Sequence, residues 1–284
     1  MTIIDGKKIR DRILAQIKKD IISLSFQPIF CDVLVGKNPS SVQYVQMKAE
    51  TAKSVGIKFI HANFPSSITT NNLIKEIKVL NNTKNMCGII VQLPLPENID
   101  RRKILNSIDP KLDVDCLGAV ASDKFYSGST AVEFPTALAC MTLLNSLNIN
   151  LQGKKIVVIG RGELVGKPVA SLLVSRGFYP DIVGSATVNK EKIIKQADVI
   201  ISGMGRGKYI TGDMVKKGVV LIDAGTSESE GGIIGDADLD SVANVASFVS
   251  PVPGGVGPVT VAMLLKNVLT VAQSLAKIRD DFIK

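Results

Sequence analysis

Two polar residues one helical turn apart are the first candidates for chemistry in this sequence. Tyr44 and Lys48 stand in "SVQYVQMK", and on a helix they would share one face with Ser41. A free lysine amine has a pKa of about 10.4, so it acts as a base at neutral pH only where burial and neighbouring dipoles lower that pKa. An isolated pair with this spacing is usually solvated, and the spacing alone leaves both interpretations open.

Gln92 and a pair of acidic residues are further candidates. Gln92 ends the apolar run 87–91 in "VQLPLP", where a buried amide needs hydrogen-bond partners. Asp113 and Asp115 lie two residues apart in "DVDCL", so in an extended segment their side chains point the same way. The backbone at a strand end would also satisfy the glutamine, and a solvated loop would carry the same two acids. Neither motif decides the function by itself.

The stretch "SPVPGGVGPVT", residues 250–260, is unusually rich in proline and glycine and directly precedes a helix. Proline, as at Pro253, makes such a loop rigid, and glycine, as at Gly254 and Gly257, lets a ligand approach the backbone. We therefore predict a ligand-binding loop, with an ordinary connection between domains as the alternative.

Three glycines follow a strand and open a helix in "VVIGRGELVG". Gly160, Gly162 and Gly166 would permit a tight turn, close approach of the backbone to a pyrophosphate, and a helix N-terminus facing the phosphates. A glycine pattern alone is a weak signal, and an ordinary turn between strand and helix would share it. The order of strand, turn, helix and second strand makes a dinucleotide site the better prediction.

The second strand of this unit bears on the choice between NAD and NADP. NAD sites usually have an acidic residue at the end of that strand. Here Asp181 stands at its start, and the end carries only Ser185 and Thr187. Arg161, in the glycine turn, would add a positive charge beside a 2′-phosphate. The sequence therefore favours NADP, and NAD is the less favoured cofactor.

The elements that must position these residues alternate between strands and helices, which predicts an α/β fold with parallel sheets. We expect two domains, residues 1–147 completed by a C-terminal helix 262–284, and a Rossmann-like domain 148–261, with the site in the cleft between them. The predicted strands are 28–36, 57–64, 87–96, 154–160, 181–184, 198–203 and 219–225. The predicted helices are 1–24, 39–55, 69–82, 136–148, 166–177, 190–197, 211–218 and 258–277.

Composition excludes several classes of function. The 284 residues carry a formal net charge of +8, but the charges are scattered, so an anionic small ligand explains them as well as nucleic acid does. His61 is the single histidine, which argues against a multi-histidine metal site and a Ser-His-Asp hydrolase. The four cysteines suggest no disulfide framework. Without a signal peptide or a run of about 20 apolar residues, we expect a cytoplasmic protein that does not enter a membrane.

Together these motifs resemble the bifunctional methylenetetrahydrofolate dehydrogenase/methenyltetrahydrofolate cyclohydrolase family over almost the whole chain. The resemblance rests on "SVQYVQMK", "VQLPLP", "DPKLDVD", "IGRGELVGKP" and "SPVPGGVGPVT", in the family's order and spacing. The chain differs from the family pattern at several places; for example, Gly162 stands where the family has a serine, and Phe134-Pro135-Thr136-Ala137 replaces Pro-Cys-Thr-Pro.

The resemblance implies NADP-dependent oxidation of 5,10-methylenetetrahydrofolate and hydrolysis of the product to 10-formyltetrahydrofolate, in one-carbon metabolism and purine biosynthesis, by a homodimer joined through the nucleotide domain. It implies no metal. The implied catalytic residues are Lys48, Tyr44 and Gln92. The implied folate contacts are Tyr44, Asp115, Pro253, Gly254 and Gly257. The implied cofactor contacts are Gly160, Arg161, Gly162, Gly166, Ser185 and Thr226.

Three alternatives stay open on the sequence. One is a monofunctional methylenetetrahydrofolate dehydrogenase that lacks the cyclohydrolase. Another is a non-catalytic folate- or nucleotide-binding protein, against which the retention of Lys48, Tyr44, Gln92 and Asp115 argues. The third is an amino-acid dehydrogenase of similar shape, which would have no need of "VQLPLP" together with "PVPGGVGP".

Overall fold

The computed structural model describes residues 1–229 and 232–283, which form two compact units. We name the units after the roles that the resemblance implies: the catalytic unit comprises Arg12–Pro135 and the chain from Val261 onward, and the nucleotide unit comprises Met1–Asp11 and Thr136–Thr260. The division falls at residues 135 and 136, so the helix that we expected at the end of the first domain groups with the nucleotide unit. The domain boundary at 147 and 148 stays a prediction.

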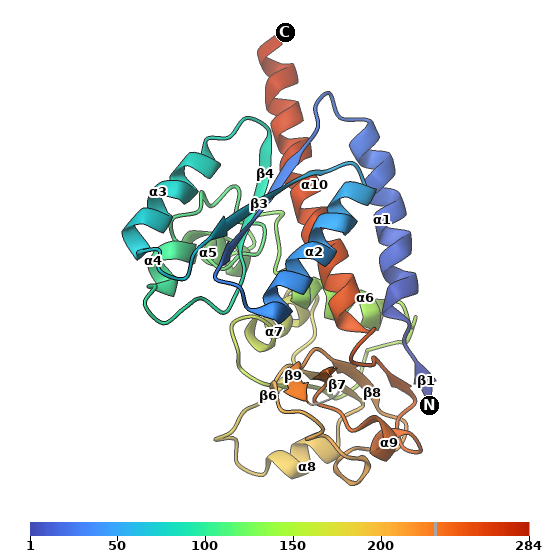
Figure 1. Ribbon diagram of the computed structural model, residues 1–284. Helices are drawn as coiled ribbons and strands as arrows, with labels where there is room; N and C mark the ends of the chain where they lie inside the picture. The colour runs from blue at the N-terminus through green and yellow to red at the C-terminus, as the bar shows by residue number, and fades with distance from the viewer. Residues whose placement is uncertain (230–231, 284) are drawn as a thin grey trace. The chain divides into compact units, whose positions relative to one another are not determined.

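The catalytic unit is built on a three-stranded parallel sheet in the order β3-β2-β4. Its strands are β2 (Ile29–Val35), β3 (Lys58–Phe64) and β4 (Met86–Val91). Figure 1 shows α1 (Gly6–Ile22), α2 (Pro39–Ser54) and α10 (Val256–Ile283) on one side of these strands, with α3 (Thr70–Asn81), α4 (Arg101–Leu105) and α5 (Ala119–Tyr126) on the other. The parallel α/β prediction is confirmed here, while α4 and α5 were not predicted.

Strand β2 is the central strand of this sheet, and every one of its residues is buried. Such a strand needs apolar residues on both faces, and "IFCDVLV" supplies them at every position except Asp32. Phe30, Cys31 and Val33 join the main hydrophobic core of the unit, together with apolar residues of α2, α3, β4 and α10. A fully buried aspartate in such a strand must therefore be accounted for by a partner.

Helix α2 carries Lys48 because of how it starts and which face it buries. Asn38 caps its N-terminus, since the Asn38 side chain accepts a hydrogen bond from the backbone N–H of Ser41. Pro39 follows in the first turn, where a backbone N–H would have no partner within the helix and its absence does not destabilise the helix. The buried residues are Ser41, Val45, Lys48 and Ala52, three or four apart. Lys48 thus points from the buried stripe of the helix and not from its solvated side.

The nucleotide unit contains a six-stranded parallel sheet in the order β1-β11-β8-β7-β5-β6. Its strands are β1 (Thr2–Ile3), β5 (Ile156–Ile159), β6 (Asp181–Val183), β7 (Val199–Ser202), β8 (Val220–Asp223) and β11 (Phe248–Val249). Strands β5, β6, β7 and β8 were predicted, whereas β1 and β11 were not. The parallel sheet of a Rossmann-like domain is therefore confirmed.

The helices of the nucleotide unit are α6 (Pro135–Asn145, whose first residue belongs to the catalytic unit), α7 (Gly166–Ser175), α8 (Lys190–Lys195) and α9 (Leu239–Val242). Three of them, α6, α7 and α8, were predicted, α9 was not, and one predicted helix is wrong. The helix expected over 211–218 is wrong: only the 3₁₀ turn η1 (Gly212–Met214) forms, because Gly212 and Gly218 bound a segment too short to propagate a helix. A short hairpin of β9 (Ser227–Ser229) and β10 (Gly232–Ile234) was also not predicted.

Helix α10 is long and apolar enough to span a membrane, as judged by length and composition alone. The segment Val256–Arg279 has a mean hydropathy of 1.5 in its most apolar window, but 61% of that window is buried within the protein. Leu265, Val268 and Ala272 on this helix belong to the core of the catalytic unit. Burial of this kind is what the core helix of a folded domain shows.

Candidate active site and nucleotide loop

The Lys48 amine is buried between two oxygen atoms of the sheet. Its Nζ atom lies 2.8 Å from Oε1 of Gln92 and 2.5 Å from Oδ2 of Asp32, and its side chain is only 2% exposed. Lys48 comes from α2, Asp32 from the middle of β2, and Gln92 from the residue after β4. The arrangement excludes the solvated-pair interpretation of Tyr44 and Lys48, because the ammonium is held inside the unit.

Gln92 is oriented by its own neighbourhood. Its Nε2 atom donates to the carbonyl oxygen of Leu93 at 2.8 Å, which leaves Oε1 directed at Lys48. Its backbone N–H donates to the carbonyl oxygen of Val33 at 2.9 Å and so continues the pairing of β4 with β2. The side chain is therefore satisfied by backbone and lysine together, and its carbonyl faces the amine.

Tyr44 lies one turn before Lys48, and the Lys48 amine is 4.8 Å from the centre of the Tyr44 ring. This is a cation–π distance. Burial, and to a lesser extent the negative charges of Asp115 and Asp32, raise the pKa of the Tyr44 hydroxyl. The phenol therefore stays protonated over the physiological range and can donate a hydrogen bond.

The two aspartates of "DVDCL" are used differently. Turns surround Asp113, which makes only an isolated bridge with Ile89, so this is not the extended segment in which both side chains would point the same way. Asp113 is 3% exposed and accepts hydrogen bonds from the backbone N–H groups of Gly118 at 2.7 Å and Asp115 at 3.3 Å. Asp113 thus holds the turn, and the turn presents Asp115.

Asp115 is half-buried and acts electrostatically on the same cluster. Burial and the charge of Asp113 raise its pKa to about 7, while the positive charge of Lys48 acts in the opposite direction. Asp115 therefore changes charge near neutral pH. Of the residues predicted for the site, the structure brings Tyr44, Lys48, Gln92 and Asp115 together in the catalytic unit.

Asp32 is a component of this cluster that the sequence analysis missed. The run "PIFCDVLVG" predicts a buried strand and by itself assigns no role to the aspartate within it. The signal available was a charged residue in the middle of an otherwise apolar strand, which requires a partner of opposite charge. The structure supplies Lys48 as that partner.

The loop after β11, residues 250–257, belongs to the nucleotide unit and is folded on itself. The backbone N–H of Gly255 donates to the carbonyl oxygen of Pro251 at 2.8 Å, and Gly254 has a φ of +108°, which favours glycine. A Cβ atom on Gly257 would meet nothing within 4 Å, so the backbone is open there. Pro253, Gly254 and Gly257 lie on this loop and at the start of α10.

In the glycine turn between β5 and α7, backbone atoms approach one another too closely for any side chain at Gly160 or Gly166. A Cβ atom on Gly166 would lie 2.1 Å from the carbonyl oxygen of Gly160, and one on Gly160 would lie 2.6 Å from that of Gly203. A Cβ atom on Gly162 would meet nothing within 4 Å, so the turn leaves open space before the helix. This combination fits a dinucleotide pyrophosphate, which needs exposed backbone N–H groups and no side chain in the way.

Arg161 reaches from the glycine turn to the end of β6. Its guanidinium donates to the carbonyl oxygen of Ile182 at 3.2 Å, and its side chain packs against Gly184. Asp181 is the first residue of β6, not the last, and its carboxylate lies 3.7 Å from the amine of Lys155. Ser185 follows the strand and is exposed, as is Thr226 after β8. The end of β6 therefore offers a cation and a hydroxyl, and no carboxylate.

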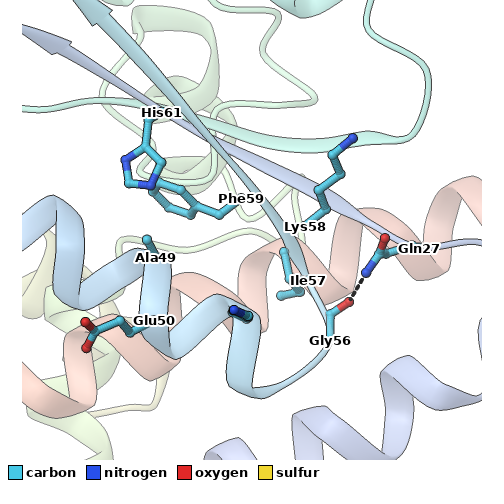
Figure 2. A pocket seen from close by; sticks show the side chains of 9 residues that line it. Gln27, Ala49, Glu50, Gly56, Ile57, Lys58, Phe59 and His61 are labelled. Carbon is cyan, nitrogen blue, oxygen red and sulfur yellow. Dashed lines mark hydrogen bonds between the residues drawn. The ribbon is translucent and has the colours of Figure 1, made fainter.

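A hollow of about 400 Å³ lies elsewhere on the catalytic unit, between α2 and β3 (Figure 2). Ala49, Glu50, Phe59 and His61 are among its lining residues, and Gln27 donates to the carbonyl oxygen of Gly56 at 3.2 Å on its rim. None of the predicted site residues is among those that line it. Within residues 1–229 and 232–283, no group of three His, Cys, Asp or Glu side chains is arranged to hold a metal ion.

Comparison with known families covers both units. Residues 4–115 match the tetrahydrofolate dehydrogenase/cyclohydrolase catalytic domain, and residues 135–276 match the NAD(P)-binding domain of the same family. Similar proteins extend over nearly the full length. "Bifunctional protein FolD" of Nautilia profundicola is 40% identical over 281 residues, 98% of this chain and 99% of that relative.

Solved structures of the same family are similar to this chain over nearly its full length. The FolD methylenetetrahydrofolate dehydrogenase/cyclohydrolase of Campylobacter jejuni has a TM-score of 0.92 and 36% identity, covering 96% of this chain and 99% of the other. The Trypanosoma brucei enzyme, complexed with NADP cofactor and inhibitor, has a TM-score of 0.90 and 32% identity, covering 96% and 98%. The chain belongs to the tetrahydrofolate dehydrogenase/cyclohydrolase family and is a bifunctional enzyme with both of that family's domains.

Proposed function

We propose that Lys48, Tyr44 and Gln92 are the catalytic residues for both activities, the NADP-dependent oxidation of 5,10-methylenetetrahydrofolate and the hydrolysis of 5,10-methenyltetrahydrofolate to 10-formyltetrahydrofolate. The observation that carries this is the burial of the Lys48 amine against Gln92 and the Tyr44 ring. A buried amine with a fixed acceptor and an adjacent phenol supports a catalytic cluster, because a surface lysine would need neither.

The oxidation needs little chemistry from the protein itself. When bound, the nicotinamide supplies the hydride acceptor. Tyr44 and Lys48 would donate hydrogen bonds to the folate and hold its one-carbon bridge in a fixed orientation, and orientation is the main contribution of protein to such a step. The methenyl product carries a positive charge that the bridge did not have before.

The hydrolysis needs a proton acceptor. Water forms a bond to the methenyl carbon and gives up one proton. One carbon–nitrogen bond then breaks while the remaining hydroxyl proton passes to the departing nitrogen, and 10-formyltetrahydrofolate remains. We assign the proton to the Lys48 amine, with Gln92 fixing the direction of the amine through the 2.8 Å contact. The relatives named bifunctional, at 38–40% identity, do not favour the alternative of a dehydrogenase without cyclohydrolase.

Folate binding would use groups from the two stretches "DVDCL" and "SPVPGGVGPVT". Asp115 can accept hydrogen bonds from ring N–H groups of the pterin, since its carboxylate is half-buried and not used by the turn. Pro253, Gly254 and Gly257 would contact the folate through backbone and ring.

The cofactor would be NADP, held by Gly160, Gly162 and Gly166 at the pyrophosphate. Arg161 and Ser185 would bind the 2′-phosphate, and Thr226 would contact the nicotinamide half. The support is the guanidinium at the end of β6 and the position of Asp181 at the strand start. We further propose a cytoplasmic homodimer that supplies formyl groups for purine biosynthesis and that binds neither nucleic acid nor membrane.

The test is a spectroscopic assay of methylenetetrahydrofolate oxidation, run in parallel with NADP and NAD, followed by an assay on methenyltetrahydrofolate alone. Formation of NADPH and loss of the methenyl absorbance are both expected. Oxidation without hydrolysis would leave a monofunctional dehydrogenase, and higher efficiency with NAD would reject the cofactor assignment.

A further inference from the structure

Asp32 differs from the other buried aspartates of the described chain in how its oxygens are used. Asp236 accepts hydrogen bonds from the Ser202 hydroxyl and from the backbone N–H groups of Met204 and Arg206, at 2.6–2.8 Å. Asp223 accepts from Gly225 and Ala237, at 2.9 and 2.8 Å. These are carboxylates whose charge is dispersed over backbone donors, as expected of structural residues.

The Asp32 carboxylate has no such donors among the described residues. Its Oδ1 atom is buried without a hydrogen-bond partner, and its Oδ2 atom meets only the Lys48 amine, at 2.5 Å. A fully buried carboxylate is costly to maintain, and a single contact compensates it poorly. Its one partner is the lysine to which we assign the proton transfer. The presence of a buried carboxylate at Asp32 is therefore explained by Lys48 and not by the needs of the strand.

We propose that Asp32 is a positioning residue that holds the Lys48 amine and shares its proton, so that the two side chains act as one neutral pair. This inference rests on the proposed role of Lys48. The pair has two proton arrangements of equal total charge, ammonium with carboxylate and amine with carboxylic acid. In the second arrangement the ammonium proton has moved from Nζ to the carboxylate, and the amine can accept the proton of the attacking water.

Two observations support proton sharing, the contact of the carboxylate with the amine and the complete burial of Asp32. Burial raises the pKa of Asp32, although the charges of Lys48 and His61 oppose that change. A carboxylate that accepts a proton readily, in contact with the amine, makes the neutral amine available without release of a proton to solvent. Availability of the base would then depend little on pH, because the transfer inside the pair leaves the number of bound protons unchanged.

Other titratable groups interact with the pair and must be kept constant in a test. They are Tyr44 on α2, Asp115 in the turn, Cys31 next to Asp32 in the chain, and His61, which pairs with Asp32 in register on β3. Asp113 acts on the pair only through its effect on Asp115. All remain in a variant that changes Asp32 alone. The ratio of variant to wild-type rate at each pH therefore isolates the pair.

The test compares Asp32→Asn with wild type, measuring cyclohydrolase kcat at saturating methenyltetrahydrofolate across the pH range where the protein is folded. Without the acceptor, Lys48 must lose its proton to solvent, so the rate ratio should fall as pH falls. Near pH 7 we expect a loss of about 10- to 100-fold, as for a displaced or mis-protonated base. NADP binding should be unchanged. A ratio near one at every pH overturns the inference.

Two variants control for a purely structural effect. Val33→Ala removes buried volume from the neighbouring position of the same strand, whose side chain points to the opposite face, so it should lower the melting temperature with a pH-independent rate ratio. If Asp32→Asn is too unstable to assay, Asp32→Asn combined with Lys48→Met should fold better than Asp32→Asn alone, because no unpaired buried charge remains. A double variant no more stable than the single one contradicts the pairing. Absence of wild-type activity would instead reject the proposed function.

Discussion

The Lys48 amine and the Gln92 amide come from different elements of one unit and meet at 2.8 Å inside it. Gln92 cannot turn its oxygen away without losing the 2.8 Å hydrogen bond from its Nε2 atom to Leu93. The direction of the lysine is therefore fixed before any substrate binds. Fixed orientation of a proton acceptor lowers the barrier of the step that uses it.

Lys48→Met should separate the two activities. The change keeps the length of the side chain and removes the amine, so hydrolysis of methenyltetrahydrofolate should fall by about two to four orders of magnitude. Some oxidation should persist, and the methenyl intermediate should accumulate in the ultraviolet spectrum. Lys53→Met, at an exposed position of the same helix, is the control and should leave both rates unchanged. Near-normal hydrolysis by Lys48→Met would show that Lys48 is not the base.

Asp115→Ala should weaken folate binding by about ten- to a hundredfold, the cost of one charge-assisted hydrogen bond of about 1.5–3 kcal/mol. NADP binding, measured by fluorescence titration, should change little. Asp113→Ala is the informative comparison, because Asp113 accepts from the backbone of Gly118 and Asp115. That variant should lower the melting temperature, by leaving buried N–H groups unpaired. Unchanged folate affinity in Asp115→Ala would remove Asp115 from the binding site.

The pKa of Asp115 makes stability depend on pH with a definite sign. Its native value of about 7 lies above the ordinary value of 3.8, so between these pH values the native protein holds a proton that the unfolded chain releases. The contribution of this group to stability is greatest at low pH and is lost as pH rises through 7. Urea unfolding at pH 5 and pH 8 should show a smaller difference for Asp115→Asn than for wild type. An equal difference in both proteins contradicts the raised pKa.

Arg161→Gln should weaken NADP and spare NAD. The guanidinium at the end of β6 is the cation that we assign to the 2′-phosphate, and loss of a charge-assisted contact costs about ten- to a hundredfold in affinity. Steady-state kcat/KM with each cofactor measures the change in preference. Arg176→Gln, at an exposed position after α7, should alter neither. An equal loss of kcat/KM with NADP and NAD would place Arg161 against a part of the cofactor that both molecules share.

Gly166→Ala and Gly162→Ala form a matched pair. An alanine Cβ at 166 would lie 2.1 Å from the carbonyl oxygen of Gly160 and must displace the turn, whereas one at 162 meets nothing within 4 Å. Gly166→Ala should therefore lower the melting temperature and abolish NADP binding. Gly162→Ala should fold normally and weaken only cofactor binding. Equal melting temperatures for both variants would contradict the close approach of the turn.

The parts of the fold that sequence predicts well are those with strong local signals. Buried strands such as β2 and β5 and the capped helix α2 have periodicity and end signals within the element itself. Strands β1 and β11 are two residues each and have no local signal, because only their pairing defines them. The helix expected over 211–218 failed because a short polar stretch between glycines depends on its surroundings.

The residues of the candidate site also differ in how well the sequence predicts them. Tyr44, Lys48 and Gln92 could be selected from spacing and motif, and resemblance placed them in one reaction. Asp32 could not, because its neighbours suggest only a hydrophobic strand, and its partner is sixteen residues along the chain on another element. Asp113 and Asp115 have the same chemistry and nearly the same position. Only the turn geometry separates the carboxylate that holds the backbone from the one that is free for a ligand.

The pairing of β1 with β11 determines when the nucleotide unit can finish folding. Thr2 and Ile3 pair with Phe248 and Val249, so β1 has no partner during synthesis until β11 has been made. The catalytic unit likewise needs α10, whose Leu265 and Val268 lie in its core. Neither unit is a continuous piece of chain, so we expect neither to fold during synthesis. Both should form late, in a reaction slowed by contacts between distant parts of the sequence.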